Sequence, residues 1–254
     1  MDYRIFKNTY IREIDGKGLN VDKDMVNQCL SNYSNFDNLD GAIVMDWGMN
    51  IGAFGRMLLD TNIKQYIGVE CHPENFEVCE KNLGHDERFC LINAAVTTQD
   101  IPEITLYLTG SKQEFCSGTT NPKSNAAKNM RKNQVKVPTV QAKKLFDIYQ
   151  PTHLKCDVEG EEYRIFEPDW FIPESIKQMS LEFHWSDRIL SDYESNQRAK
   201  FIEQGFKPLQ EQLNLVPGDK QVMFLGEEVK YRNIWGMDTP VSYTHLRAHE
   251  TFGY

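Results

Sequence analysis

The stretch that most constrains the fold of this chain runs from Ala42 to Asp60 and reads AIVMDWGMNIGAFGRMLLD. An apolar run ends at Asp46 and Trp47, and a second apolar run follows glycines at positions 48, 52 and 55. The first run predicts a buried strand, and the second predicts a helix that opens at the glycines. Glycines let the chain turn sharply and approach a ligand closely, and the free amides of a helix start point back towards such a turn. The stretch therefore predicts a strand–turn–helix unit with a ligand site at the turn, although glycines also permit close packing of a helix on a strand.

Strand and helix patterns alternate along the rest of the chain. Further strands are expected at 65–70, 88–96, 103–110, 152–158, 178–185 and 221–226, with a short edge strand at 134–140 because Pro138 has no amide hydrogen to donate. Helices are expected at 73–83, where Pro73 occupies the first turn, and at 143–149 and 193–206. This alternation predicts an α/β, Rossmann-like fold with a mostly parallel sheet, helices on both faces and a late antiparallel strand. Ligands on such sheets bind at the carboxyl ends of the strands.

The pattern divides the chain into three parts. Residues 1–40 are polar and contain one amphipathic pattern, at 21–36, so we expect them to form an N-terminal helical extension. Residues 41–237 are expected to form the main domain. Residues 238–254 do not continue the pattern, and their pair of histidines, His245 and His249, has no third metal ligand nearby. We expect these residues to be a tail foreign to the domain.

The charge and cysteine content exclude several classes of protein. The 254 residues include 28 Lys and Arg against 37 Asp and Glu, a formal charge of −9, which argues against general binding to nucleic acid or anionic membranes. The six cysteines form no C-x-x-C pair, so we expect them to be reduced thiols. No apolar run has the form of a signal peptide or membrane helix, so we expect a cytoplasmic protein.

Residues 121–144 hold seven basic residues and no acidic one. They predict either a flap that meets an anionic acceptor or a solvated loop.

The residues around the turn narrow the choice of ligand. The spacing here is G-x-x-x-G-x-x-G, whereas dinucleotide enzymes use G-x-G-x-x-G to hold a pyrophosphate. Asp46, two residues before the first glycine, would repel a pyrophosphate but suits a cationic amine, such as that in the methionine part of S-adenosylmethionine (SAM). Asn50 tolerates left-handed backbone, and Glu70, 24 residues after Asp46, is placed to accept hydrogen bonds from ribose hydroxyls.

Five segments resemble the FkbM family of class I SAM-dependent methyltransferases. They are VMDWGMNIGAFG, IGVECHPENFEVCEKNL, INAAV, LKCDVEGEEYRIFE and MSLEFH, in the family's order and spacing between Ala42 and Trp185. The D-V-E-G-E part of the fourth segment is the most specific. The chain departs from the family pattern at Trp47, which is bulkier than the usual aliphatic residue, at Cys71–His72, and after Trp185.

The resemblance implies a role for each matching residue. The amino-acid end of SAM would be held by Asp46, Gly48, Asn50 and Gly52, the ribose by Glu70, and the adenine would lie by Asn93 and Ala94. Asp157 and Glu159 would lie near the transferred methyl group and the acceptor. The family transfers methyl groups mainly to oxygen, often on sugar or polyketide hydroxyls, so the implied partner is a small-molecule or glycan acceptor.

Methyl transfer from a sulfonium requires an aligned acceptor oxygen and often a general base. The candidate catalytic residues are Asp157 and Glu159 from one strand end and His184 from the next, with His184 serving either as the base or as a packed, hydrogen-bonded histidine. Together with Glu182 they have the chemistry to bind a divalent metal, but we expect no metal because the carboxylates can bind acceptor hydroxyls instead.

Two other classes of function compete with methyl transfer. An NAD-dependent oxidoreductase or epimerase is disfavoured because the chain lacks G-x-G-x-x-G and a Tyr-x-x-x-Lys pair. A non-catalytic binding module is disfavoured because the acid–glycine–acid set is complete.

Overall fold

The computed structural model describes residues 2–32, 36, 38–108, 118–120, 133–159, 161–165, 173, 175–183 and 221–226. The helix predicted at 193–206, the tail at 238–254 and half of the basic stretch lie outside the described residues.

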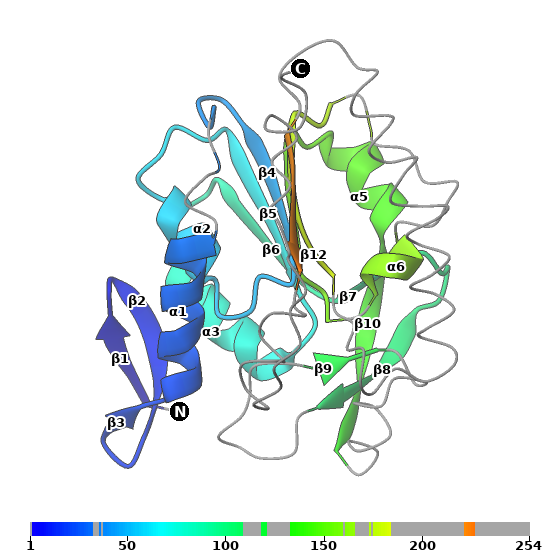
Figure 1. Ribbon diagram of the computed structural model, residues 1–254. Helices are drawn as coiled ribbons and strands as arrows, with labels where there is room; N and C mark the ends of the chain where they lie inside the picture. The colour runs from blue at the N-terminus through cyan, green and yellow to red at the C-terminus, as the bar shows by residue number, and fades with distance from the viewer. Residues whose placement is uncertain are drawn as a thin grey trace, which may run out of the picture.

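Six parallel strands form the central sheet, in the order β13-β12-β11-β4-β5-β6 (Figure 1). Their bounds are β4 Ile43–Trp47, β5 Gln65–Glu70, β6 Phe89–Asn93, β11 His153–Cys156, β12 Gln178–Phe183 and β13 Gln221–Gly226. From β4 the sheet grows in one direction through β5 and β6, and from β11 it grows in the other. The strand order therefore reverses between β4 and β11, and this is where a ligand is expected at the carboxyl ends of the strands.

The prediction of a late antiparallel strand is wrong. The last described strand, β13, runs parallel to β12, with Gln178 opposite Gln221 and Phe183 opposite Gly226. A parallel pair needs a crossover connection rather than a tight turn, and residues 184–220 provide enough chain for one.

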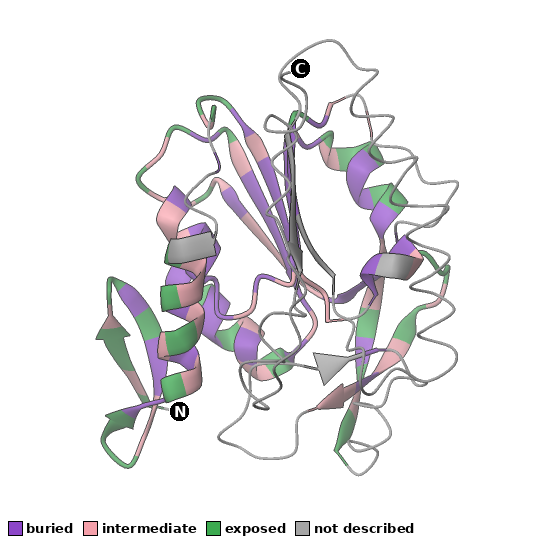
Figure 2. Cartoon of the chain, in the orientation of Figure 1, coloured by how far each residue is buried: buried purple, intermediate pink, exposed green. Residues whose placement is uncertain are grey.

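Helices cover both faces of the sheet, as predicted (Figure 1). On one side lie α1 (Asn20–Asn32), α2 (Ala53–Leu58) and α3 (Pro73–Leu83), and on the other lie α5 (Ala142–Tyr149) and α6 (Glu162–Ile165). Side chains alternate along β4, so that Val44 belongs to the apolar cluster that includes Phe54 of α2, and Met45 belongs to the cluster that includes Leu145 of α5. Figure 2 shows the resulting burial of the central strands, which fits their mainly apolar sequences, although β4 and β11 also bury Asp46 and Lys155. In the described part of the chain, no helix has both the length and the apolarity needed to cross a membrane.

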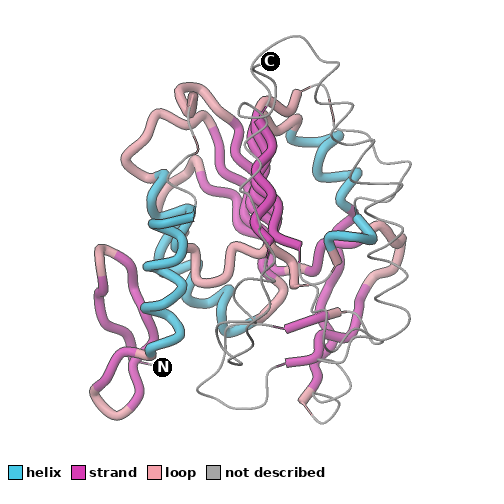
Figure 3. Tube along the Cα trace, in the orientation of Figure 1, coloured by secondary structure: helices cyan, strands magenta, loops and turns pink. Residues whose placement is uncertain are grey.

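The N-terminal extension contains the predicted helix, α1, but also a three-stranded antiparallel sheet that we did not predict (Figure 3). Its strands are β1 Asp2–Phe6, β2 Thr9–Ile14 and β3 Lys17–Gly18. Two-residue turns join them, with left-handed backbone at Lys7 (φ 46°), Asn8 (62°), Asp15 (51°) and Gly16 (74°). Asp-Gly between two strands is a strong hairpin signal, so the sequence carried evidence for this sheet. We call residues 2–32 the N-terminal unit.

A second sheet, in the order β7-β10-β8-β9, continues from the carboxyl end of β6. Its strands are β7 Ala95–Thr97, β8 Glu103–Leu108, β9 Gly118–Thr119 and β10 Gln134–Gln141. The strand predicted at 88–96 is therefore divided at Ala94 between two sheets. The prediction of an edge strand at 134–140 is also wrong, because β10 lies between β7 and β8. Pro138 is tolerated there because β10 changes partner at this residue, pairing with β8 up to Pro138 and with β7 from Thr139.

Candidate functional site

Residues 48–52, which we call the glycine turn, connect β4 to α2 through three left-handed residues. The angle φ is 78° at Gly48, 52° at Asn50 and 81° at Gly52, a region that glycine and asparagine adopt most readily. The amides of Gly48 and Met49 both donate to the carbonyl of Val69, at 2.9 and 3.1 Å. The turn therefore folds over the carboxyl end of β5, and the predicted left-handed backbone at Asn50 is confirmed.

Gly48 also brings the glycine turn against the end of β11. A Cβ atom at residue 48 would lie 1.8 Å from the carbonyl oxygen of Asp157, and the Asp157 amide donates to the carbonyl of Trp47 at 2.9 Å. The glycine turn and the start of the predicted acidic segment are thus in direct backbone contact. Because any side chain would separate them, this position requires glycine for its close approach as well as for its φ.

Asp46 lies beneath the glycine turn, fully buried. Its Oδ1 is 3.0 Å from Lys155 Nζ, and its Oδ2 accepts a hydrogen bond from the hydroxyl of Tyr66 at 2.6 Å. Burial, followed by the nearby Asp46 carboxylate, raises the pKa of Tyr66 well above its ordinary value, so this hydroxyl remains a donor. The predicted direct contact between Asp46 and a ligand amine therefore needs correction, since the carboxylate has no exposed surface and already has a cationic partner.

Lys155 is the main residue of the site that the sequence reasoning missed. It lies beside Asp46 on the neighbouring strand, donates to the carbonyl of Gly48 at 3.1 Å, and lies 3.9 Å from Asp157 Oδ2. Burial by itself lowers the pKa of a lysine, but the carboxylates of Asp46 and Asp157 outweigh it, so the pKa of Lys155 is raised and the ammonium stays charged. The available signal was a lysine inside a core strand, which is rare without a buried counter-charge.

Glu70 ends β5 directly beside the glycine turn. Its Oε2 accepts the Asn50 amide at 2.9 Å and its Oε1 accepts the His72 amide at 2.7 Å. Burial raises the pKa of the Glu70 carboxyl to about 7, and the two amides, which favour the charged form, offset this only in part. The residue is 6% exposed, and each carboxylate oxygen has a second lone pair for another donor.

Asn93 and Ala94 lie next to Glu70, at the point where β6 ends. The Asn93 side chain donates to the Glu70 carbonyl at 2.8 Å, and the Ala94 amide donates to the same oxygen at 3.1 Å. The structure thus brings together Glu70, which was expected to hold the ribose, and Asn93 and Ala94, which the family resemblance places by the adenine.

The acidic segment after β11 has two partly exposed and two buried members. Asp157 and Glu159 are partly exposed, and Glu159 adopts left-handed backbone with φ 55°. Glu162 is buried and accepts the Val158 amide at 3.0 Å, while buried Glu161 accepts hydrogen bonds from other parts of the chain. These donors to Glu161 are the Thr120 hydroxyl at 2.6 Å and the Arg164 guanidinium at 2.9 Å. The hydrogen bonds of buried Glu161 and Glu162 therefore hold the segment in place, while Asp157 and Glu159 stay partly exposed to solvent.

The remaining catalytic predictions are only partly covered by the structure. His184 and the side chain of Glu182 lie outside the described residues. Within the described ranges, no three His, Cys, Asp or Glu side chains gather closely enough to hold one metal ion.

Three lysines of the basic stretch lie in its described half. They form exposed ion pairs with nearby acids, which are Lys136 with Glu103, Lys143 with Asp147, and Lys144 with Asp100. These pairs favour a solvated surface for this half of the stretch. The other half of the stretch, residues 121–132, lies outside the described residues.

The assembled residues fit SAM. The glycine turn, whose Met49 and Ile51 side chains are buried in the core, lies with the Glu70 carboxylate and the Asn93–Ala94 pair at the carboxyl ends of β4, β5 and β6. The partly exposed acids adjoin them at β11. A nucleoside can thus be held through its ribose, with its reactive end towards carboxylates that suit a hydroxyl-bearing acceptor.

Comparison with known proteins agrees with this chemistry. A family model described as the methyltransferase FkbM domain matches residues 46–208. No curated protein matches the chain. One similar structure is a proposed RNA methyltransferase from Pyrococcus horikoshii, with 21% identity, coverage of 31% of this chain and 40% of that chain, and a TM-score of 0.25. Another belongs to the complex of the Haloferax volcanii Trm112 methyltransferase activator with a proposed methyltransferase, with 21% identity, coverage of 32% and 37%, and a TM-score of 0.27.

A third similar structure is the C-domain of a bacterial malonyl-CoA reductase with NADP, with 12% identity, coverage of 89% and 32%, and a TM-score of 0.31. The alignments span at most 40% of the length of these three chains. At such low TM-scores the family assignment depends on the family model alone.

Proposed function

The chain belongs to the FkbM family of SAM-dependent methyltransferases, and on that premise we propose that it methylates a hydroxyl oxygen of a small-molecule or glycan acceptor. The proposal is supported by the accessible acids beside the glycine turn, which can bind and deprotonate a hydroxyl. The net charge of −9 disfavours a nucleic-acid acceptor. The cytoplasmic location remains a prediction that cell fractionation tests.

In this proposal the cofactor is held mainly by backbone and by one carboxylate. Glu70 accepts the ribose hydroxyls, Asn93 and Ala94 border the adenine, and the glycine turn borders the amino-acid end. Asp46 acts indirectly, because its ion pair with Lys155 supports the glycine turn from below at the Gly48 carbonyl.

Bound SAM supplies an electrophilic methyl group on its sulfonium. Asp157 and Glu159 orient the acceptor hydroxyl by hydrogen bonds, and one of the two carboxylates accepts its proton as the oxygen becomes a nucleophile. Positioning provides much of the rate of such a displacement, and a general base adds about 10²–10⁴-fold.

The backbone contact between Gly48 and Asp157 carries the proposal. At this contact Asp157 adjoins the glycine turn, with no room for a side chain between them.

The first experiment is a thermal-shift measurement with S-adenosylhomocysteine (SAH), with NAD as the competing ligand. SAH at 100 times its dissociation constant should stabilise the protein by about 2.7 kcal/mol. Stabilisation by NAD and not by SAH would overturn the proposed function. Labelled SAM incubated with cell extract, followed by mass identification of the product, then identifies the acceptor.

The second experiment is the substitution Asp157→Asn, assayed with that acceptor. We expect transfer to fall about 10²–10⁴-fold while SAH affinity changes little. Asp147→Asn, which makes the same change at an exposed ion pair on α5, is the matched control. Equal methyl-transfer activity in the two variants would show that Asp157 takes no part in the reaction.

A further inference from the structure

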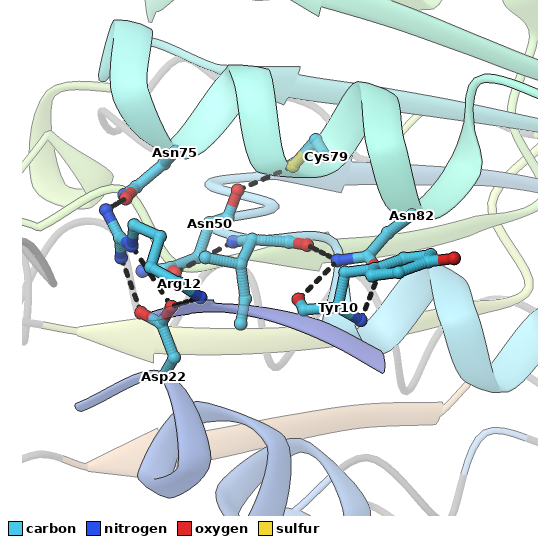
Figure 4. Close-up of polar contacts among 8 residues, drawn as sticks. Tyr10, Arg12, Asp22, Asn50, Asn75, Cys79 and Asn82 are labelled. Carbon is cyan, nitrogen blue, oxygen red and sulfur yellow. Dashed lines mark hydrogen bonds and ion pairs between the residues drawn. The ribbon is translucent and has the colours of Figure 1, made fainter. Parts of the chain in front are cut away.

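Asn82, near the end of α3, connects the glycine turn to the N-terminal unit (Figure 4). Its side-chain nitrogen donates to the carbonyl of Ile51 at 2.8 Å and to the carbonyl of Tyr10 at 3.1 Å, and its side-chain oxygen accepts the Tyr10 amide at 2.7 Å. The residue is 2% exposed. Both hydrogens and the oxygen of the side-chain amide are therefore hydrogen-bonded. The two bonds to Tyr10 fix the orientation of this amide, and hence the direction from which it donates to the Ile51 carbonyl.

The N-terminal unit also encloses the side chain of Ile51. This side chain is fully buried in a cluster that includes Ile11 of β2, Val26 of α1 and Val78 of α3. Ile51 is thus held twice by the same surroundings, through its side chain and through its carbonyl oxygen.

The carbonyl before Ile51 has a partner on the same helix. Cys79, three residues before Asn82 on α3, donates its thiol hydrogen to the carbonyl of Asn50 at 2.6 Å, as Figure 4 shows. The amide of Asn50 in turn donates to Glu70. Two consecutive carbonyls of the glycine turn are therefore fixed by α3, and the turn is bonded on its other side to the carboxylate assigned to the ribose.

We propose that Asn82 is a positioning residue for SAM, and that it sets the geometry of the glycine turn by bonding Ile51 to the backbone of β2. The proposal depends on the glycine turn holding SAM, as in the proposed function. Loss of the Asn82 donor leaves a buried carbonyl without its partner, and the turn relaxes away from the geometry that matches the cofactor. The N-terminal unit is on this account a part of the cofactor site.

The experiment compares Asn82→Ala with Asn75→Ala. Asn75 lies on the same helix, is equally buried at 2% exposure, and binds the N-terminal unit by accepting a hydrogen bond from the Arg12 guanidinium at 3.0 Å. We expect both variants to lower the melting temperature. SAH affinity, measured by calorimetry, should fall about tenfold in Asn82→Ala, or about 1.4 kcal/mol, and should stay within about twofold of wild type in Asn75→Ala.

Asn82→Asp gives a second variant in case the alanine variant does not fold. It keeps an acceptor for the Tyr10 amide but loses both donor hydrogens, so we expect a similar loss of SAH affinity. Unchanged affinity in a folded Asn82 variant overturns the proposal, and so does an equal loss in Asn75→Ala, which would mean that affinity follows general stability. A wild-type protein that fails to bind SAH overturns the proposed function as well, so the two failures are distinguishable.

Discussion

Replacing Gly48 with alanine tests whether close backbone contact holds the two halves of the site together. The added Cβ would lie 1.8 Å from the Asp157 carbonyl oxygen and 2.8 Å from its carbonyl carbon. Both are backbone atoms, so no side chain can rotate away to make room. The glycine turn and the end of β11 must separate by more than an ångström before ordinary contact is restored.

The cost has two parts that a control variant separates. An alanine with left-handed backbone costs about 1–2 kcal/mol, and forcing atoms into an occupied region costs about a further 1–3 kcal/mol. Gly41 has φ 67° and nothing within 4 Å of an added Cβ, so Gly41→Ala carries only the first part. We therefore expect Gly48→Ala to lose roughly 2–5 kcal/mol of unfolding free energy, and Gly41→Ala only about 1–2 kcal/mol.

Urea denaturation of the two variants measures this difference, and calorimetry with SAH measures its effect on the site. Because separation moves Asp157 away from the glycine turn, methyl transfer should fall further than SAH affinity in Gly48→Ala, and neither should change in Gly41→Ala. If the two variants lose the same free energy, or if Gly48→Ala retains wild-type transfer, the close contact does not have the role we assign to it.

Two further predictions concern the buried charges. Lys155→Met leaves the fully buried Asp46 carboxylate without its counter-charge and should cost about 3–5 kcal/mol of unfolding free energy; adding Asp46→Asn should recover part of the loss, and a double variant no more stable than the single one would contradict the pairing. Glu70 has its pKa raised from 4.5 to about 7, so its contribution to stability is fully present below pH 4.5 and is lost as the pH rises through 7. Between pH 4.5 and pH 7 the unfolding free energy of wild type should fall by about 3 kcal/mol relative to that of Glu70→Gln. Urea denaturation of both proteins at pH 5 and pH 8 measures this change. A free-energy difference between the two proteins that does not vary with pH would refute it.

The features that were predicted correctly depend on residues that are close together in the sequence. The strand, the glycine turn and the following helix are consecutive in the sequence. Pro73 begins α3 because its fixed φ suits the first turn of a helix. The position of Glu70 beside the turn also followed from spacing, because a βα unit returns the next parallel strand to the neighbouring position.

The errors concern partners that are distant in sequence. Direct contact between Asp46 and a ligand was expected because nothing near Asp46 in the sequence reveals its counter-ion, Lys155, which is 109 residues away on a strand that only the fold brings beside it. Pro138 indicated an edge strand because nothing local reveals that β10 changes partner at that residue. The N-terminal sheet is a different case, since its Asp15–Gly16 hairpin signal was present and was not used.

The pair formed by Asp46 and Lys155 has a consequence for how the site is assembled. Asp46 lies opposite Lys155 in the register of β4 and β11, and both are buried among apolar neighbours. A slip of one residue between these strands would place Asp46 opposite Leu154 or Cys156 and leave two buried charges unpaired, which is far more costly than losing apolar contacts. The ion pair therefore specifies the register of the two strands whose ends carry the glycine turn and the acidic segment. Since these ends meet at Gly48 and Asp157, the proposed function requires this register, and the cost of unpaired buried charges adds to that of lost apolar packing in disfavouring a slip.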